Sequence, residues 1–407
     1  MNGVMNMTKK AIVAGSIALD IVMKLPDVNP GQIQSIFSQG KITNLSGVHM
    51  YLGGETGNTG LAMSKMGIPV TVACKIGHDH PGKMIQEIFS EYDLDSRIKI
   101  ADHANSTVAI SVTPPGMDKI SFLYKGAGQT FMWEDVPADS LASADLFHFG
   151  YPTAMDHLFA DEGSEFLKIF SEAKKFGITT SVDTTLPDLN SPAGQVHWKS
   201  ILEKVLPFVD IFVPSIEETL FMLDRDQYIR EVERVGGGNM VDHIDPNQVA
   251  EIGSSLIAMG PKIVLIKMGK QGLYLKTADK NSFTSFGRAA PVKFDDWYDR
   301  ELWDPALDTE PIRSTTGAGD TAIAGFLSAF LQGEKPERAL EIASMAASLC
   351  ISSYDTVSKI GKLSEIKALL DQKPGHPRLP VSLNPENWQK SRDFPIFHSR
   401  QDHQIDC

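Results

Sequence analysis

Apolar and polar positions along the chain alternate between two local patterns, short buried strands and amphipathic helices. Four segments rich in β-branched residues are predicted as buried strands: "AIVAG" (11–15), "ITTSV" (178–182), "DIFV" (210–213) and "KIVLIK" (262–267). Apolar residues at helical spacing predict helices in six further segments: 58–66, 82–91, 161–176, 197–205, 216–223 and 247–258. Strands that alternate with helices require crossover connections, so the pattern predicts an α/β fold with a mostly parallel sheet and helices on both faces.

Two regions depart from this alternation. Residues 21–50 carry little helical pattern, and residues 107–124 ("TVAISVTPPGMDKISFLY") form two alternating segments around a Pro-Gly turn. The second pattern is typical of an antiparallel hairpin. Together the two regions, at about 21–50 and 105–126, predict a small β-element attached to the main sheet. A small sheet over a large α/β body is a natural lid.

Composition narrows the classes of partner. The formal net charge of -13 argues against nucleic acid or an anionic membrane as the main partner. The three cysteines, Cys74, Cys350 and Cys407, lie far apart and form no metal-ligand spacing, which fits a reducing compartment. We recognise no signal peptide and no run of about 20 apolar residues, so we expect a cytoplasmic protein without a membrane partner.

The segment "RSTTGAGDT" (313–321) ends where a helix is predicted to begin. The following "AIAGFLSAFLQG" has apolar residues at helical spacing, which places Gly317 to Asp320 at a helix N-terminus. Free backbone N–H groups and the helix dipole favour an anion at such an end. An acidic residue beside an anion-binding site indicates a catalytic role rather than a role in packing.

A second glycine cluster, "YLGGETGNTGLAMSKMG" (51–67), precedes another predicted helix. The pair Gly53 and Gly54 permits close backbone approach to a ligand, and Asn58 offers a donor and an acceptor to a hydroxyl-rich molecule. The alternative is a tight turn with Asn58 as a helix cap, and the motif taken alone favours that interpretation. The sequence contains no G-x-x-x-x-G-K-[ST] motif, which argues against a P-loop enzyme.

In this order and separation, the two clusters resemble the signatures of the ribokinase-like (PfkB-type) carbohydrate kinase family. The first signature, a Gly-Gly pair followed by Asn, corresponds to Gly53, Gly54 and Asn58; the second, Asp-Thr-x-Gly-Ala-Gly-Asp, corresponds to Ser314 through Asp320. The resemblance covers about residues 10–365 and is supported by four more segments: "GSIALD" (15–20), "GHDHPG" (77–82), "DIFVPSIEET" (210–219) and "IKMGKQG" (266–272). It implies a three-layer αβα sandwich with a mostly parallel sheet and a small β-lid.

The resemblance implies phosphorylation of a hydroxyl group of a sugar or sugar derivative, with ATP and Mg²⁺ as cofactors. Asp320 is then the general base, and the turn of Gly317, Ala318 and Gly319 presents N–H groups to the transferring phosphoryl group. The expected substrate contacts are Asp20, Gly53, Gly54, Asn58 and Asp183, the last of which either reaches the pocket rim or caps its own turn. The expected nucleotide-binding residues are Lys267, Gly269, Gly272, Thr316 and Ser344. Glu218 is expected to organise Mg²⁺ through water.

Four positions depart from the family pattern, and one of them is Ala18, which occupies a position that is polar in some sugar kinases. Ser314 replaces an Asp that helps some members to hold a monovalent cation, which argues against activation by potassium. Ser215 replaces the Asn of the Asn-x-x-Glu motif and implies weaker organisation of the metal. Gly150 lies where some members place an acidic sugar contact. His148 and Tyr151 are candidate replacements, although core packing is the favoured interpretation for His148.

The expected organisation is one kinase domain, residues 1–370, followed by a C-terminal extension, residues 371–407. Residues 280–312 are predicted as an insertion, either a surface excursion with aromatic anchors or a flap beside the nucleotide or an interface. The extension is expected to wrap the surface or to stay mobile. The resemblance also allows a homodimer.

Two rival functions stay open. A nucleoside kinase of the same fold is the nearest rival. A non-catalytic sugar-binding or regulatory relative is suggested by Ser314 and Ser215, but the intact Gly-Ala-Gly turn with Asp320 speaks against it. A dinucleotide-dependent oxidoreductase lacks its glycine fingerprint.

Overall fold

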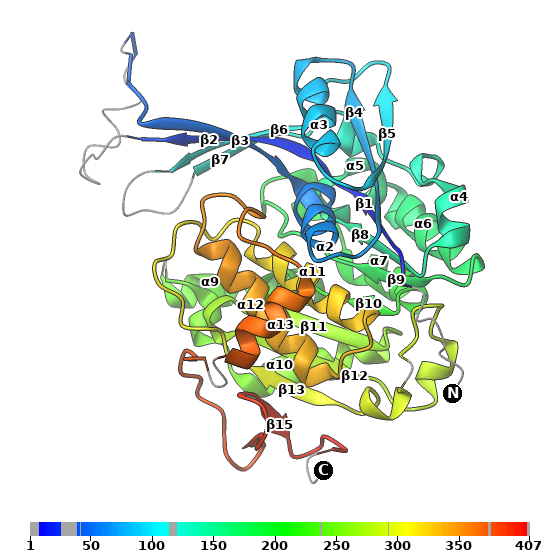
Figure 1. Ribbon diagram of the computed structural model, residues 1–407, viewed down its shortest axis with the longest axis vertical. Coiled ribbons are helices and arrows are strands. Elements are labelled where there is room, and N and C mark those ends of the chain that lie inside the picture. The colour runs from blue at the N-terminus through cyan, green and yellow to red at the C-terminus, as the bar shows by residue number, and fades with distance from the viewer. Residues whose placement is uncertain are drawn as a thin grey trace.

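A large mixed sheet forms the centre of the molecule (Figure 1). The computed structural model describes residues 8–25, 39–40, 42–113, 120–236, 238–291, 293–372 and 376–404. Within these residues, seven strands of the sheet run parallel in the order β11–β10–β9–β8–β1–β4–β5. In chain order they are β1 Ala11–Gly15, β4 Val70–Gly77, β5 Asp95–Ala101, β8 Leu146–Gly150, β9 Thr179–Val182, β10 Ile211–Phe212 and β11 Ile263–Lys267.

Helices cover both faces of this sheet, because alternate strand residues pack into two different cores. Val13 of β1 belongs to one core, whereas Ile12 and Ala14 belong to the other. The first core contains residues of α2 Leu61–Lys65, α3 His80–Ser90, α11 Ala318–Leu331, α12 Pro336–Ile351 and α13 Leu363–Gln372. The second contains residues of α4 Ala138–Ser143, α5 Asp156–Phe159, α6 Ser164–Lys175, α7 Trp198–Val205, α8 Ile216–Leu223, α9 Arg225–Val235 and α10 Pro246–Ala258. No helix in the described part of the chain combines the length and the apolar character that a membrane crossing needs.

A second sheet of four strands projects from the main body (Figure 1). Its strands lie in the order β3–β2–β6–β7, with bounds β2 Ala18–Lys24, β3 Gly47–Gly53, β6 Val108–Thr113 and β7 Ile120–Tyr124. The predicted hairpin is present, since β6 and β7 pair antiparallel. Its Pro-Gly turn and much of the region 21–50 lie outside the described residues. Three of the apolar side chains of this sheet, Met50, Phe122 and Tyr124, are exposed.

Four antiparallel strands extend the large sheet beyond β11. They are β12 Leu273–Thr277, β13 Glu301–Asp304, β15 Phe397–Ser399 and β14 Trp388–Lys390, in that spatial order. Strand β13 belongs to the predicted insertion, and its Trp303 is fully buried. Strands β14 and β15 belong to the predicted extension. Both segments therefore contribute strands to the sheet, which the sequence interpretation did not anticipate.

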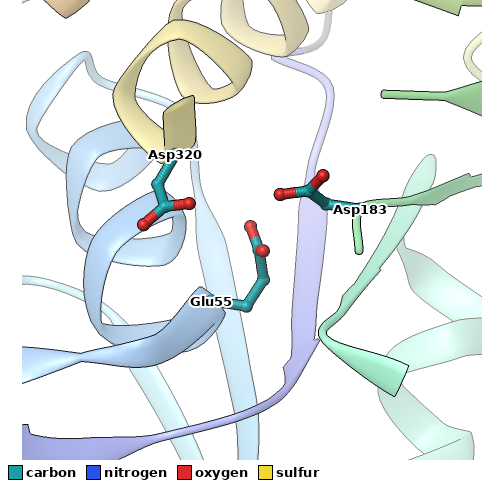
Figure 2. Close-up of side chains that lie close together, drawn as sticks. All are labelled: Glu55, Asp183 and Asp320. Carbon is teal, nitrogen blue, oxygen red and sulfur yellow. The ribbon is translucent and has the colours of Figure 1, made fainter. Parts of the chain in front are cut away.

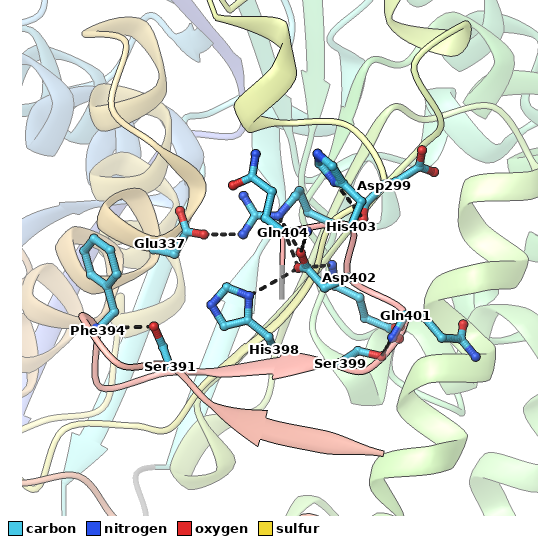
Figure 3. A network of polar contacts seen from close by, with 12 residues as sticks. Asp299, Glu337, Ser391, Phe394, His398, Ser399, Gln401, Asp402, His403 and Gln404 are labelled. Atoms are coloured by element: carbon cyan, nitrogen blue, oxygen red, sulfur yellow. Dashed lines mark hydrogen bonds and ion pairs between the residues drawn. The ribbon is translucent and has the colours of Figure 1, made fainter. Parts of the chain in front are cut away.

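A buried group of charged residues ties the last segment to the body, here called the C-terminal cluster: Arg300, Glu337, His398 and Asp402. Arg300 forms ion pairs with Glu337 of α12 and, at 3.0 Å, with Asp402. Asp402 also accepts hydrogen bonds from the backbone N–H groups of Glu301 and Gln404, at 3.0 and 2.9 Å. Figure 3 shows Glu337, His398 and Asp402 converging from different elements. The charged contacts therefore bridge the insertion, α12 and the C-terminal segment.

Candidate active site

The predicted helix start is present at the "GAGD" segment. Helix α11 begins at Ala318, and its N-cap Gly317 lies in the left-handed region with φ of 75°. A side chain would not fit there, because a Cβ atom on Gly317 would lie 2.4 Å from Thr356 Cγ2. Glycine therefore permits the turn that starts the helix. Asp320 lies in the first turn, where backbone N–H groups lack intrahelical partners and the helix dipole favours negative charge.

Asp320 is held by side chains from two distant parts of the sequence. Its Oδ2 accepts a hydrogen bond from Asn58 Nδ2 at 2.6 Å, and its Oδ1 accepts one from the hydroxyl of Tyr151. The Thr59 hydroxyl donates to its backbone carbonyl at 3.2 Å. The two glycine-rich motifs therefore meet in space, and both carboxylate oxygens of Asp320 are oriented by donors.

Two cavities meet at this aspartate. The first has a volume of about 400 Å³ and the second of about 280 Å³. Asp320, Gly319 and Tyr151 line both of them. A larger depression of about 530 Å³, around Gly67 and Asp93, contains none of the predicted site residues. Two ligands bound in the two cavities would therefore lie on either side of one carboxylate.

The first cavity gathers most of the predicted substrate contacts. Asp20 reaches it from the small sheet, and Gly54 and Asn58 reach it from the segment after β3. Gly53 does not line the cavity, but a Cβ atom there would lie 2.3 Å from Asp20 Oδ1, so this glycine leaves room for that carboxylate. Thr316, predicted beside the nucleotide, also lines this cavity.

The second cavity contains the remaining acidic site residues, Asp183 and Glu218, together with Lys267 and Gly269. Glu218 lies in the first turn of α8 and forms a capping box with Ser215, whose hydroxyl accepts from the Glu218 N–H at 3.2 Å. Glu218 Oε2 accepts from the Ser215 N–H at 2.8 Å and from the Thr184 hydroxyl at 2.9 Å. Ser215 therefore orients Glu218, although it replaces the asparagine of the family motif.

Three buried carboxylates come together at the boundary between the cavities, and we call them the carboxylate cluster: Glu55, Asp183 and Asp320. One oxygen of each lies within 4.8 Å of the others. Figure 2 shows Glu55 pointing into the space between Asp183 and Asp320. Glu55 Oε2 is buried and has no hydrogen-bond partner among the described residues. The cluster therefore contains a buried carboxyl oxygen that its own hydrogen bonds do not satisfy.

Burial controls the ionisation of this cluster. Burial and the charge of Asp320 raise the pKa of Glu55 to about 8. Burial also raises the pKa of Asp183 well above its ordinary value, although the charge of Lys267 opposes this rise. His148 Nε2 lies 2.8 Å from Glu55 Oε1, but burial and the charge of Lys267 lower the pKa of His148 to about 3. His148 is therefore neutral at pH 7 and supplies no counter-charge to Glu55.

Besides Gly53, three predicted site residues line neither cavity: Ser344, Gly272 and Ala318. Ser344 of α12 is buried and donates to Asp304 Oδ2 at 2.5 Å. Gly272 has φ of 91°, and a Cβ atom on it would lie 2.0 Å from the Asp304 carbonyl oxygen. Both residues therefore pack beside the end of β13. Ala318 is the first residue of α11 and contributes its backbone to the turn.

Glu55 and Tyr151 are the residues for which the sequence interpretation was least informative. Glu55 received no role, although an acid directly after a Gly-Gly pair was an available signal. A Cβ atom on Gly150 would lie 2.3 Å from Glu55 Oε2, so an acid does lie beside this glycine, but it comes from another segment. Tyr151 was considered only as a replacement sugar contact, whereas its hydroxyl bonds to Asp320.

A helix-covered, mostly parallel sheet with two adjoining cavities is typical of an α/β enzyme that binds two small ligands side by side. The pfkB family carbohydrate kinases match residues 16–362, so the chain belongs to this family. It is therefore a carbohydrate kinase, and the family predicted from the two glycine clusters is confirmed.

Relatives and solved structures agree with this assignment. The ribokinase of Staphylococcus aureus (strain COL) is 24% identical over 366 residues, which cover 88% of this chain and 99% of the relative. The nucleoside kinase of Methanothermobacter thermautotrophicus is 27% identical over 317 residues, which cover 77% and 82%. The structure of Arabidopsis thaliana ribokinase complexed with ribose and ATP superposes with a TM-score of 0.60 at 19% identity, covering 89% of this chain and 99% of that one. The predicted α/β ribokinase-like fold, with its large and mostly parallel sheet, is confirmed.

Proposed function

We propose that the protein transfers the γ-phosphoryl group of ATP to a hydroxyl group of a sugar or sugar derivative, with Asp320 as the general base. The observation that carries this proposal is the position of Asp320 on the wall shared by two cavities. The acceptor occupies the first cavity, beside Asp20 and Asn58. The terminal phosphates of the nucleotide enter the second, beside Gly269.

The transfer makes one bond and breaks one at phosphorus, and it moves one proton. The acceptor oxygen bonds to the γ-phosphorus, the bond from that phosphorus to the β,γ-bridging oxygen breaks, and the hydroxyl proton passes to Asp320. ADP leaves with the bridging oxygen. Phosphoryl transfer requires mainly positioning and charge stabilisation, which the hydrogen bonds from Asn58 and Tyr151 to Asp320 support.

The turn of Gly317, Ala318 and Gly319 is the proposed anion hole. It forms the start of α11, where unpaired N–H groups and roughly half a positive charge favour a phosphoryl group. Gly319 lines both cavities, so this helix end lies where the transferring group must pass.

The residues of the second cavity fit a magnesium ion. Mg²⁺ prefers oxygen ligands and retains several waters, so a carboxylate that is fixed by its own hydrogen bonds suits contact through water. Glu218 has this character, because Ser215 and Thr184 both donate to its Oε2. When bound, Mg²⁺ neutralises phosphate charge. Replacing Glu218 with Gln should raise the Mg²⁺ concentration needed for half-maximal activity, and an unchanged requirement would argue against this role.

The small sheet is the proposed lid over the acceptor. Six of its residues line the first cavity: Ala18, Asp20, Ala109, Ser111, Ser121 and Leu123. These come from β2, β6 and β7, so one rigid displacement of the sheet would open or close the cavity.

The test is a screen for acceptor-dependent ADP formation with Mg²⁺, across sugars, sugar acids and nucleosides. We expect turnover with a sugar or sugar derivative, and mass spectrometry should show one added phosphate. Preference for a nucleoside would favour the nucleoside kinase. The absence of turnover with every acceptor would contradict the proposal and favour a binding protein.

A further inference from the structure

Lys267 is the last residue of β11 and lines the second cavity. Its ammonium donates to Asp183 Oδ1 at 2.5 Å and to the Val213 carbonyl oxygen at 2.6 Å. An ammonium group has three N–H donors. Within the described residues these two atoms are the hydrogen-bond acceptors of Lys267, so one donor is left for a ligand.

The side chain of Lys267 also lies against the first turn of α11. A Cβ atom on Gly319 would lie 3.4 Å from Lys267 Cε and 4.0 Å from its Nζ. Gly319 in turn lines both cavities. The ammonium and the backbone of the anion hole are therefore neighbours at the point where the two cavities meet.

Acidic groups outnumber cations around the second cavity. Among the described residues that line it, Lys267 is the single cation, and the acids are Asp183, Glu217, Glu218 and Asp320. Burial alone would lower the pKa of Lys267, but the charges of Asp183 and Glu218 raise it above its ordinary value. Lys267 therefore stays charged at neutral pH. Among the described residues that line the second cavity, Lys267 is thus the one cation whose side chain can donate a charge-assisted hydrogen bond to a phosphate oxygen.

Building on the proposed kinase function, we propose that Lys267 is a further catalytic residue, whose ammonium donates to an oxygen of the transferring phosphoryl group. Asp183 is a positioning residue that holds this ammonium beside the anion hole. The hydroxyl proton still passes to Asp320, and Lys267 keeps its own protons throughout. The contact strengthens as charge shifts onto the phosphoryl group and its leaving oxygen.

The test compares two nucleotides that differ in the group Lys267 contacts. Lys267→Met removes the ammonium but retains an unbranched side chain. Calorimetry with Mg²⁺ should show affinity for the non-hydrolysable β,γ-imido analogue of ATP weakened by about tenfold or more, with little change for ADP. The kcat should fall by about 10²–10³-fold, with a much smaller change in the KM of the acceptor.

Lys75→Met is the matched control. Lys75 lies in β4, pairs with Asp135 at 2.9 Å and is buried to a similar extent, but lines neither cavity. This variant should keep the kcat and both nucleotide affinities of the wild type. Because Lys267→Met leaves Asp183 buried without its cation, the double variant Lys267→Met/Asp183→Asn serves as a second test in a protein without that unpaired charge.

The outcomes separate the two proposals. An equal loss of affinity for both nucleotides, or a wild-type kcat in either Lys267 variant, would overturn the role of Lys267. A wild-type protein that binds both nucleotides but phosphorylates no acceptor would contradict the proposed kinase function. Even without turnover, a loss of affinity for the ATP analogue but not for ADP in the Lys267 variants would support the contact between Lys267 and the phosphate.

Discussion

The carboxylate cluster and the C-terminal cluster are both buried groups of charged residues, but their ionisation differs in direction. Burial pushes the pKa of Asp402 upward, yet the His398 imidazole 3.6 Å away and the charge of Arg300 hold it below its ordinary value. In the carboxylate cluster, burial and neighbouring acids raise the pKa of Glu55 and Asp183. Fixed donors surround the ionised Asp402 of the C-terminal cluster, whereas in the carboxylate cluster Glu55 Oε2 has no donor among the described residues.

This difference indicates different roles. In the C-terminal cluster one guanidinium contacts two carboxylates, and backbone N–H groups complete the shell of Asp402. Such an arrangement joins segments of the fold. In the carboxylate cluster one ammonium, that of Lys267, contacts one of three acids, and Glu55 Oε2 lacks a donor. Excess acidity in a cavity is typical of sites that work on charged ligands.

The largest expected effect on stability comes from the C-terminal cluster. Arg300→Met should lower the free energy of unfolding by about 3–5 kcal/mol, because it leaves Glu337 and Asp402 buried without their cation. Denaturant unfolding measures this change. Arg234→Met is the surface control, since Arg234 pairs with Glu231 in a largely exposed position and should contribute little. If Arg300→Met and Arg234→Met were equally stable, the C-terminal cluster would not have the stabilising role that distinguishes it from the carboxylate cluster.

The pH dependence of stability should reveal Glu55. Its folded pKa of about 8 exceeds the ordinary 4.5, so the associated stabilisation is fully present below pH 4.5 and is lost as the pH rises through 8. Glu55→Gln cannot titrate. Relative to this variant, the wild type should therefore lose on the order of a few kcal/mol between pH 5 and pH 9. Unfolding curves that stay parallel across this range would show that Glu55 titrates normally.

The smallest expected effect is the loss of one donor to Asp320. Tyr151→Phe removes the hydrogen bond to Oδ1 but leaves the one from Asn58 to Oδ2, so we expect about a tenfold fall in kcat. Tyr274→Phe is the control, since that buried hydroxyl donates to Glu301 at 2.7 Å and lines neither cavity. If the two variants lost activity equally, the Tyr151 contact would be structural.

The sequence was most informative where the signal was local. The strand at 11–15 and the helices at 216–223 and 247–258 lie where apolar spacing predicts them. The same holds for the helix start at Gly317, because glycine and an acid in the first turn are local requirements. Strands β13, β14 and β15 have only three or four residues and carry little periodic pattern, so their pairing depends on tertiary contacts.

The site was predictable only in part for the same reason. Motifs identified Asp320 and Asn58 separately, and their hydrogen bond joins residues 262 positions apart. Glu55 and Asp183 become a cluster only when β3, β9 and α11 converge, which no local pattern records. The sequence predicted Lys267 as a nucleotide-binding residue. Its ion pair with Asp183 was not predictable, because the pair forms only when β9, β10 and β11 lie side by side in the sheet.

The most direct test of the proposed chemistry is the turnover of Asp320→Asn at saturating ATP and acceptor. Asparagine preserves the size of the side chain but cannot accept the hydroxyl proton. We expect kcat to fall by about 10²–10⁴-fold, while nucleotide affinity and the melting temperature stay close to those of the wild type. Wild-type turnover in this variant would contradict the assignment of Asp320 as the base.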